Sequence, residues 1–286
     1  MNVAVIGAGA WGTALAITSA RGGCDVTLWS YDGAIASWDG VKTPESVHVT
    51  RDMSMIGTAD VWLIATPSAF FADTLSSASQ FYNGQPVIIC TKGAEVSTGR
   101  LMSEILRDVL PECGEYGVLS GPQFAAEVAR AVPTGSTMAG TDVTRAAGRV
   151  ALSDLYLSET DDIIGAEICG VGKNAVALIT GYASVVTGEN ERAMIFTRAW
   201  GDVVAIGHAM GARMETFLDL CGIGDLFLSA ASATSRNFSG GMAIAHGDAP
   251  SGTVEGVCAI SGLISRAEML GVDVPTLCEM RRRMGL

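Results

Sequence analysis

Two lysines stand where a charged amine could take part in proton transfer. Lys173 lies within residues 167–187, a helical pattern made almost wholly of Ala, Gly, Val, Ile and Cys, and Lys92 follows an apolar strand predicted over 87–90. Lysines are rarely buried without a partner, and a desolvated ammonium gives up its proton more readily, which suits a general acid. The alternatives are that Lys173 lies at the frayed start of its helix and extends to water, and that Lys92 is a surface lysine in a turn.

Further polar groups lie towards the C-terminus. Asp225 ends a Gly-Ile-Gly-Asp segment, where helix capping is a sufficient explanation. The segment Ser235-Arg236-Asn237 contains an arginine, and a guanidinium suits forked recognition of a phosphate or carboxylate. A solvated turn would have the same composition. Glu255 is equally open to a functional or a structural interpretation.

The start of the chain carries a GxGxxG motif between an apolar strand predicted over 2–6 and a helical pattern from residue 13. Gly7 would allow the tight turn out of the strand, Gly9 a close approach of backbone N–H groups to a pyrophosphate, and Gly12 close packing of the helix on the sheet. The helix N-terminus adds unpaired N–H donors and a partial positive charge. In this context the motif predicts a dinucleotide site, the alternative being merely a tight strand–helix turn.

The elements that would position these residues alternate in the first half of the chain. We predict strands over 2–6, 25–29, 60–65, 87–90, 117–119 and 136–139, and helices over 13–21, 68–80, 98–110, 124–129 and 143–152. Long helical patterns follow over 167–187, 192–210, 214–221 and 225–233, and then towards residue 280. This order predicts an α/β protein with an N-terminal Rossmann-type doubly wound parallel sheet (1–163, dinucleotide-binding) and a C-terminal all-helical substrate and catalytic domain (164–286).

Composition limits the classes of function. The 286 residues carry a net charge of −12, which argues against nucleic-acid binding but allows an anionic small substrate beside local Lys and Arg. The seven cysteines are scattered without a CxxC, as expected of reduced core residues in a cytosolic protein. The three histidines do not pair at ligand spacing, so no metal site is predicted. We expect no signal peptide, because a strand starts at residue 2, and no membrane span, because the apolar segment 175–186 is short.

Together these motifs resemble the bacterial-type NAD(P)-dependent glycerol-3-phosphate dehydrogenases over nearly the whole chain. The matching segments are GAGAWGTALA (7–16), TKG (91–93), SGPQFAAEVA (120–129), GVGKNAVAL (170–178), CGIGDLFLSA (221–230), SRN (235–237) and VEG (254–256). The resemblance implies an oxidoreductase that transfers hydride reversibly between NAD(P)H and dihydroxyacetone phosphate, giving sn-glycerol 3-phosphate for phospholipid biosynthesis. It also implies a homodimer, and the scattered cysteines favour a cytoplasmic location.

The resemblance implies a catalytic role for three residues. Lys173 would act as general acid and base on the C2 oxygen, Lys92 would contact substrate and cofactor, and Asp225 would orient Lys173 and bind a substrate hydroxyl. The implied substrate contacts also include Gly121, Gln123, Ser235, Arg236 and Asn237, with Arg236 as anchor for the phosphate or pyrophosphate. The implied cofactor contacts are Gly7, Gly9, Ala10, Trp11, Gly12, Tyr31, Lys92, Ala125, Arg236, Thr253 and Glu255.

The chain departs from the family pattern in places. Gln123 stands where the family usually has a small hydroxyl residue, the stretch 31–52 and the C-terminus are short, and no extra basic residue follows Asn237. After the second predicted strand, no Arg or Lys is adjacent in sequence, and an inward-pointing Asp32 would repel a 2′-phosphate. Both NAD and NADP fit the motif, and these residues favour NAD.

Two other functions remain open from the sequence. A ketopantoate or 3-hydroxyacid reductase would share a Rossmann half, a helical half and a lysine, although the SRN and GIGD segments favour the triose phosphate. A non-catalytic dinucleotide sensor would keep the fold, but the joint presence of Lys92, Lys173 and Asp225 argues against it.

Overall fold

The computed structural model describes residues 1–95, 98–249 and 255–286, which separate into two units. The first unit comprises residues 1–91 and 102–163, and the second comprises residues 92–101 and 164–286. The segment that carries Lys92 therefore belongs to the helical unit, although it directly follows a strand of the first unit. The assignment of dinucleotide binding to the first part and substrate binding to the second stays a prediction.

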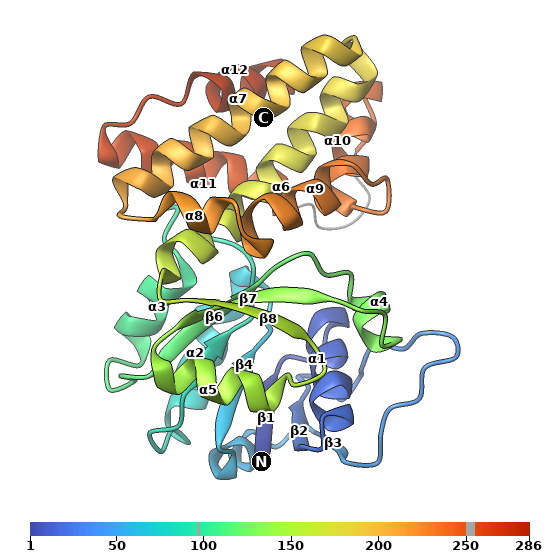
Figure 1. Ribbon diagram of the computed structural model, residues 1–286, viewed down its shortest axis with the longest axis vertical. Helices are drawn as coiled ribbons and strands as arrows, with labels where there is room; N and C mark the ends of the chain where they lie inside the picture. The colour runs from blue at the N-terminus through green and yellow to red at the C-terminus, as the bar shows by residue number, and fades with distance from the viewer. Residues whose placement is uncertain (96–97, 250–254) are drawn as a thin grey trace. The chain divides into compact units, whose positions relative to one another are not determined.

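The first unit is built on one eight-stranded sheet in the order β3-β2-β1-β4-β5-β6-β7-β8 (Figure 1). The strands are β1 (Asn2–Ile6), β2 (Asp25–Trp29), β3 (Val47–Thr50), β4 (Val61–Ile64), β5 (Val87–Ile89), β6 (Tyr116–Ser120), β7 (Gly135–Gly140) and β8 (Tyr156–Thr160). Neighbouring strands are parallel except β6 and β7, which are antiparallel. The predicted Rossmann-type sheet is confirmed, with this one antiparallel pair added.

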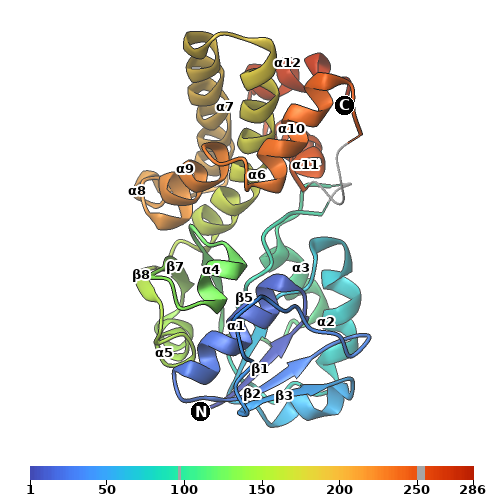
Figure 2. The same cartoon turned by 90° about the vertical axis from the view of Figure 1, so that its right-hand side faces the viewer.

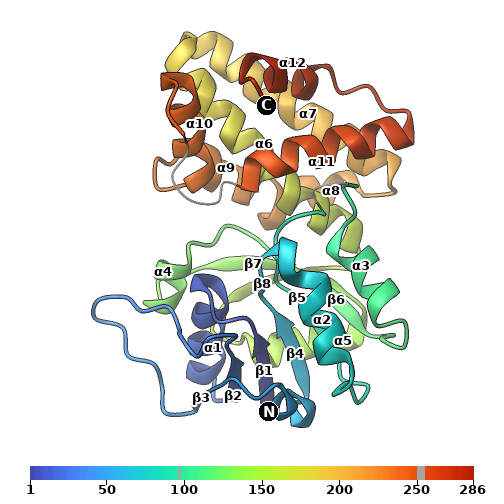
Figure 3. The same ribbon diagram turned by 180° about the vertical axis from the view of Figure 1, so that it is seen from behind.

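Helices cover both faces of this sheet. Helices α1 (Ala10–Arg21) and α5 (Asp142–Ala151) lie on one face, and α2 (Phe71–Ser79) and α3 (Met102–Val109) lie on the other (Figures 1 and 3). The shorter elements are η1 (Met53–Thr58), η2 (Ser68–Phe70) and α4 (Ala125–Ala129). Because β1, β4 and β5 are buried on both sides, they read as continuous runs of apolar, largely branched residues.

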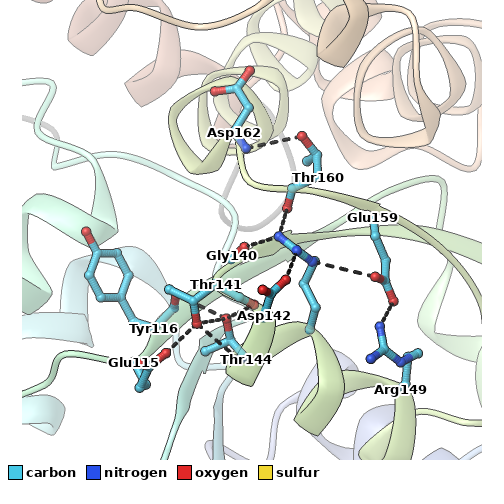
Figure 4. A network of polar contacts seen from close by, with 11 residues as sticks. Glu115, Tyr116, Gly140, Thr141, Asp142, Thr144, Arg149, Glu159, Thr160 and Asp162 are labelled. Carbon is cyan, nitrogen blue, oxygen red and sulfur yellow. Dashed lines mark hydrogen bonds and ion pairs between the residues drawn. The ribbon is translucent and has the colours of Figure 1, made fainter.

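A polar network holds the last two strands to α5 (Figure 4). Arg145 Nη1 on α5 donates to the carbonyl oxygen of Gly140 at 2.6 Å and to that of Thr160 at 3.4 Å. Glu159 of β8 lies 3.6 Å from Arg145 Nε and 2.5 Å from Arg149 Nη1. Charged contacts thus fix the edge strand β8. Its sequence is polar and therefore did not predict a strand.

The second unit is helical, as predicted (Figure 2). Its elements are α6 (Ile163–Val186), α7 (Glu189–Ala209), α8 (Met214–Phe217), the π-helical turn η3 (Leu220–Gly224), α9 (Asp225–Ala230), α10 (Arg236–His246), α11 (Glu255–Leu270) and α12 (Pro275–Arg283). Within the described residues, α6 alone is long and apolar enough to cross a membrane, and 83% of its most apolar window is buried in the structure. Helix α6 is therefore placed as the core helix of this unit.

Candidate active site

Lys92, Lys173 and Asp225 converge in the second unit. Lys173 Nζ lies 3.1 Å from Asp225 Oδ1, and Lys92 Nζ lies 2.9 Å from Asp225 Oδ2. The Asp225 side chain has no exposed surface, and the two lysine side chains are only 13% and 15% exposed. One buried carboxylate thus binds two ammonium groups, one through each oxygen.

Three separate segments deliver these side chains. Lys173 stands in the middle of α6, not at a frayed end, and is held by Asp225 rather than extending to water. Asp225 is the first residue of α9 after the π-helical turn, while Gly224 occupies the N-cap position. The capping interpretation of Asp225 and the solvent-exposed interpretations of the two lysines are therefore wrong.

Close backbone packing fixes these elements. A Cβ at Gly172 would lie 2.3 Å from Val203 Cγ1 of α7, and one at Gly222 would lie 2.1 Å from the Phe217 carbonyl oxygen. Only glycine fits at such distances, so α6 and the π-helical turn can approach their neighbours closely next to Lys173 and Asp225. Single π-helical turns are frequent at functional sites.

Burial and charge act in opposite directions on these groups. Burial lowers the pKa of Lys92, with Lys173 adding to the effect, while Asp225 partly offsets it. Burial alone would raise the pKa of Asp225, but the two lysines and their hydrogen bonds together lower it. Two lysines thus share the single Asp225 carboxylate, while the more distant charge of Glu255 also acts to raise the pKa of Lys92.

Ser229 completes the cluster and was missed in the sequence. Its hydroxyl lies 3.1 Å from Lys173 Nζ and 3.4 Å from Asp225 Oδ1. Ser229 is 4% exposed and lies one helical turn after Asp225 on α9. The spacing of four residues places both side chains on one helix face, but this spacing becomes informative only once Asp225 is known to belong to the site.

A second chain of hydrogen bonds runs beside Lys173. Asn237 Nδ2 donates to Asn174 Oδ1 at 2.8 Å, and Asn174 Nδ2 donates to Glu255 Oε2 at 3.1 Å. The backbone N–H of Gly256 donates to Asn237 Oδ1 at 2.9 Å. These bonds join α6, α10 and the first turn of α11, and Asn174 was not singled out from the sequence.

The remaining predicted residues of this unit differ in setting. Ser235 is the N-cap of α10, where its hydroxyl accepts from the backbone N–H of Phe238 at 3.4 Å. Arg236 is exposed on the first turn of the same helix, where a guanidinium is free to meet an anion from solvent. Thr253 lies outside the described residues.

The glycine motif of the first unit has the shape that a dinucleotide requires. Gly7 has a φ of +108°, and a Cβ at Gly12 would lie 1.8 Å from the Gly7 carbonyl oxygen. A Cβ at Gly9, by contrast, would meet nothing within 4 Å. Gly9 is also the N-cap of α1, and no side chain of the described residues caps that helix. The N-terminus of α1 therefore lacks a side-chain cap and has open space beside Gly9, which fits a pyrophosphate.

The side chains around this motif have different exposures. Ala10 and Trp11 form the first turn of α1, and Trp11 Nε1 is buried without a hydrogen-bond partner in the described part of the chain. Tyr31 follows β2 with 84% of its surface exposed. These positions are compatible with contacts to a dinucleotide, and their roles stay predictions.

The turn after β2 carries the carboxylate of Asp32 and lies beside the guanidinium of Arg51. Asp32 Oδ1 accepts from the backbone N–H of Ala34 at 2.9 Å and from the Ser30 hydroxyl at 3.2 Å, and these bonds lower its pKa, helped by Arg51. Arg51 follows β3, and its Cδ would lie 3.4 Å from a Cβ at Gly33. No basic residue is adjacent in sequence, yet pairing of β2 with β3 brings one to this turn.

Gln123 bends back onto the sheet. Its Nε2 donates to the hydroxyl of Ser136 on β7, while its Oε1 is buried without a partner in the described residues. Gly121 is equally close to this strand, since a Cβ there would lie 2.8 Å from Ser136 Cα. Ala125 begins α4. The larger residue at 123 thus fills space against β7.

The cysteines form no disulfide, and all seven lie among the described residues. Five are buried, Cys258 is half-buried and Cys278 is exposed, so the prediction of core positions is wrong for Cys278. In the described part of the chain, no three His, Cys, Asp or Glu side chains gather into a group that could hold a metal ion.

Comparisons with known proteins agree with this arrangement. Residues 2–146 match the family of NAD-dependent glycerol-3-phosphate dehydrogenase N-termini, and residues 162–282 match that of the C-termini. The glycerol-3-phosphate dehydrogenase (NAD(P)+) of Parvibaculum lavamentivorans is 36% identical over 96% of this chain and 89% of its own length. The crystal structure of the Coxiella burnetii glycerol-3-phosphate dehydrogenase has a TM-score of 0.90 at 28% identity, covering 99% of this chain and 94% of that one.

More distant structures share the fold alone. A ketopantoate reductase of Ralstonia eutropha covers 100% of this chain and 97% of its own, with a TM-score of 0.67 and 17% identity. The fold therefore does not separate the two enzyme classes, whereas both family matches and the near-full-length relatives do. On these grounds the chain belongs to the NAD-dependent glycerol-3-phosphate dehydrogenase family.

Proposed function

We propose that this protein catalyses reversible hydride transfer between NAD(P)H and dihydroxyacetone phosphate, giving sn-glycerol 3-phosphate for phospholipid biosynthesis. The observation that carries the proposal is the pairing of Lys92 and Lys173 with one buried carboxylate. The sequence contains only three lysines, and the third, Lys42, is exposed in the first unit. An otherwise lysine-poor chain thus concentrates its buried amines at Asp225.

Lys173 acts as the acid in the reducing direction. A bound reduced nicotinamide supplies the hydride. As C2 of the ketone becomes tetrahedral, negative charge develops on its oxygen, and the Lys173 ammonium donates the proton that completes the alcohol. In the oxidising direction the neutral amine takes that proton back. Asp225 and Ser229 hold Nζ of Lys173 in one place from two sides, so little reorganisation precedes the transfer.

Lys92 supplies a second positive charge. Its pKa is lowered mainly by burial, and its ammonium donates to Asp225 Oδ2. Because both oxygens of Asp225 accept from lysines, this carboxylate acts by orienting the amines. The ammonium groups held in this way then stabilise the oxyanion as it forms.

The phosphate of the substrate has a suitable partner in the same unit. Arg236 is exposed at the first turn of α10, where the helix N-terminus adds a partial positive charge. The chain of hydrogen bonds through Asn174, Asn237 and Glu255 fixes this turn beside Lys173. Binding energy from the phosphate helps to align the carbonyl with the lysine.

The first unit holds the dinucleotide. Gly7, Gly9 and Gly12 leave the N-terminus of α1 open to the pyrophosphate. At the adenosine end, Asp32 is tied into its own turn and lies beside Arg51. We therefore infer that Arg51 admits the 2′-phosphate, so that NADPH is used as well as NADH.

A substrate panel tests the proposal. The full chain is mixed with NADH or NADPH and with dihydroxyacetone phosphate, unphosphorylated dihydroxyacetone or ketopantoate, and the loss of reduced-nicotinamide absorbance is followed. We expect fast turnover with the phosphate ester alone. Turnover with ketopantoate alone, or NADH binding without turnover of any substrate, would contradict it.

We also infer that the enzyme acts as a cytoplasmic homodimer. The family resemblance supports this inference. Light scattering coupled to size-exclusion chromatography measures the mass directly, and a mass of one chain at working concentration would contradict the dimer.

A further inference from the structure

The segment that carries Lys92 is a short antiparallel turn. Ala94 pairs with Leu101 in an antiparallel bridge. The backbone N–H of Glu95 donates to the Arg100 carbonyl at 2.8 Å, and that of Gly99 donates to the Glu95 carbonyl at 2.8 Å. We call the described residues 92–95 and 98–101 the strap. These bonds make its two arms one unit, with Lys92 at the start of the first arm.

The strap is fastened to helix α11 at Gly99. Arg266 donates to the Gly99 carbonyl oxygen from Nε at 3.3 Å and from Nη2 at 3.2 Å. A Cβ at Gly99 would lie 2.2 Å from the carbonyl oxygen of Gly262, one turn earlier on α11. Gly99 also has a φ of +68°. A glycine is thus needed here both for its backbone conformation and for the close approach.

Arg266 is an unusual residue for this place. It is only 9% exposed, on a helix face that otherwise buries Gly262, Leu263 and Ala267. A guanidinium is buried at such a position only when hydrogen bonds compensate its lost hydration. Two donors of its fork, Nε and Nη2, point at the Gly99 carbonyl of the strap, which fixes that carbonyl in direction as well as distance.

The same helix also carries part of the site. At the first turn of α11, Glu255 accepts from Asn174, the neighbour of Lys173, and the Gly256 N–H donates to Asn237. Helix α11 therefore holds the Lys173 side of the cluster at its start and the Lys92 segment at Arg266. One helix therefore contacts both segments that carry the two amines, Lys173 and Lys92, which meet at Asp225.

We propose that Arg266 is a positioning residue that, by clamping Gly99 onto α11, places the Lys92 ammonium against Asp225. This inference rests on the proposed function in one respect, the catalytic use of Lys92. The position of Lys92 itself can be measured without any turnover.

Lysine labelling provides that measurement, because the chain has only three lysines. The full-length protein is given a short pulse of an amine-acetylating reagent, and mass spectrometry of its peptides reports each labelling rate. Exposed Lys42, in the other unit, serves as internal reference. In Arg266→Leu we expect the labelling rate of Lys92 to rise at least about 5-fold relative to that of Lys42. The labelling rate of Lys173 relative to Lys42 should stay constant. The reactivity of an amine depends on its exposure to the reagent and on its protonation state.

A second variant reaches the clamp without touching Arg266. Gly99→Ala drives a Cβ into Gly262 and should give the same selective exposure of Lys92. Gly271→Ala is the matched control, because Gly271 has nearly the same φ, +67°, but a Cβ there meets nothing within 4 Å. Any effect of left-handed backbone strain appears in both variants, and the effect of the clamp appears in Gly99→Ala alone.

Kinetics separate positioning from general loosening. We expect kcat of Arg266→Leu to fall about 10-fold or more, because misplacing a reacting group by about 1 Å can cost up to about 100-fold in rate. The affinity for 5′-AMP, which lacks the nicotinamide half of the cofactor, should change little. Arg266→Lys, which keeps one charged donor, should recover part of kcat.

Several outcomes would overturn the clamp. Unchanged labelling of Lys92 in Arg266→Leu and Gly99→Ala would do so, as would an equal rise at Lys92 and Lys173, which would indicate loss of the fold. Selective exposure of Lys92 in a protein that turns over none of the substrates would support the clamp and refute the proposed function instead.

Discussion

Lys173 and Asp225 stand 52 residues apart in the sequence, yet Lys173 Nζ lies 3.1 Å from Oδ1 of Asp225 in the helical unit. The contact is nearly sealed from water, since the carboxylate has no exposed surface. An ammonium held in this way is a fixed proton donor rather than a mobile surface charge.

Replacing that donor should stop the chemistry without affecting dinucleotide binding. We expect Lys173→Ala to lower kcat by about 10²–10⁴-fold, the usual contribution of a general acid. The affinity for NADH, measured by fluorescence titration, should stay within a factor of about two, because the glycine motif lies in the other unit. Lys42→Ala is the matched control, and near-normal turnover of Lys173→Ala would refute the assigned role.

Much of the fold follows from local pattern. Strands β1, β4 and β5 are short apolar runs buried on both faces, and α6 is a long apolar run, so each was predicted. Strands β3 and β8 were missed because edge strands need no apolar face, and β8 is fixed by Arg145 and Arg149 instead.

A local pattern can also be overridden. A helix was predicted over 98–110, but α3 begins only at Met102. Gly99 and Leu101 are used instead by the strap, whose contacts with Gly262 and Arg266 lie more than 160 residues away. Tertiary contacts of that range leave no trace in the periodicity of the segment.

The site was predicted in parts. Lys173 was found as an unusual residue, because a charged lysine in an apolar helix is rare, whereas the roles of Lys92 and Asp225 came from the family resemblance. Their partners were harder to find. Arg51 reaches the turn after β2 only through the pairing of β2 with β3, and a lone serine such as Ser229 carries no sequence signal of its own.

Asp225 should matter for stability in a pH-dependent way. Asp225→Asn leaves two scarcely exposed ammoniums without their carboxylate, so we expect a loss of about 3 kcal/mol in the free energy of unfolding near neutral pH. Because the pKa of Asp225 is lowered on folding, its contribution is complete above its ordinary value of 3.8 and is lost as the pH falls towards the lowered value.

Urea unfolding of both proteins between neutral and acid pH checks this. The difference between wild type and Asp225→Asn should be constant above about pH 5 and shrink below the ordinary aspartate pKa. The other carboxylates titrate in both proteins, so their contributions cancel in the difference between the two free energies of unfolding. A gap that widened towards acid would contradict the lowered pKa.

Two glycines of the first unit should behave differently. Gly12→Ala places a Cβ 1.8 Å from the Gly7 carbonyl oxygen, so we expect a loss of stability of about 1–3 kcal/mol or more from overpacking. Gly9→Ala meets no atom within 4 Å and should leave the melting temperature nearly unchanged while weakening NADH binding, because the added methyl occupies space meant for the pyrophosphate. Equal melting temperatures for the two variants, or full NADH affinity in Gly9→Ala, would contradict this assignment.

Arg51 should decide how well the 2′-phosphate is tolerated. Its side chain lies beside the turn that carries Asp32, and Asp32 already accepts two hydrogen bonds within that turn. We expect Arg51→Ala to lower kcat/KM for NADPH about 10-fold or more and to leave the value for NADH within about 2-fold, since a charge-assisted contact contributes about 1.5–3 kcal/mol. Calorimetric titration with adenosine 2′,5′-bisphosphate and with 5′-AMP tests the same contact without turnover, and Arg107→Ala, also exposed in the first unit, is the control. If Arg51→Ala bound both nucleotides as the wild type does, Arg51 would not contact the 2′-phosphate. The interpretation that Asp32 favours NAD over NADP would then stand.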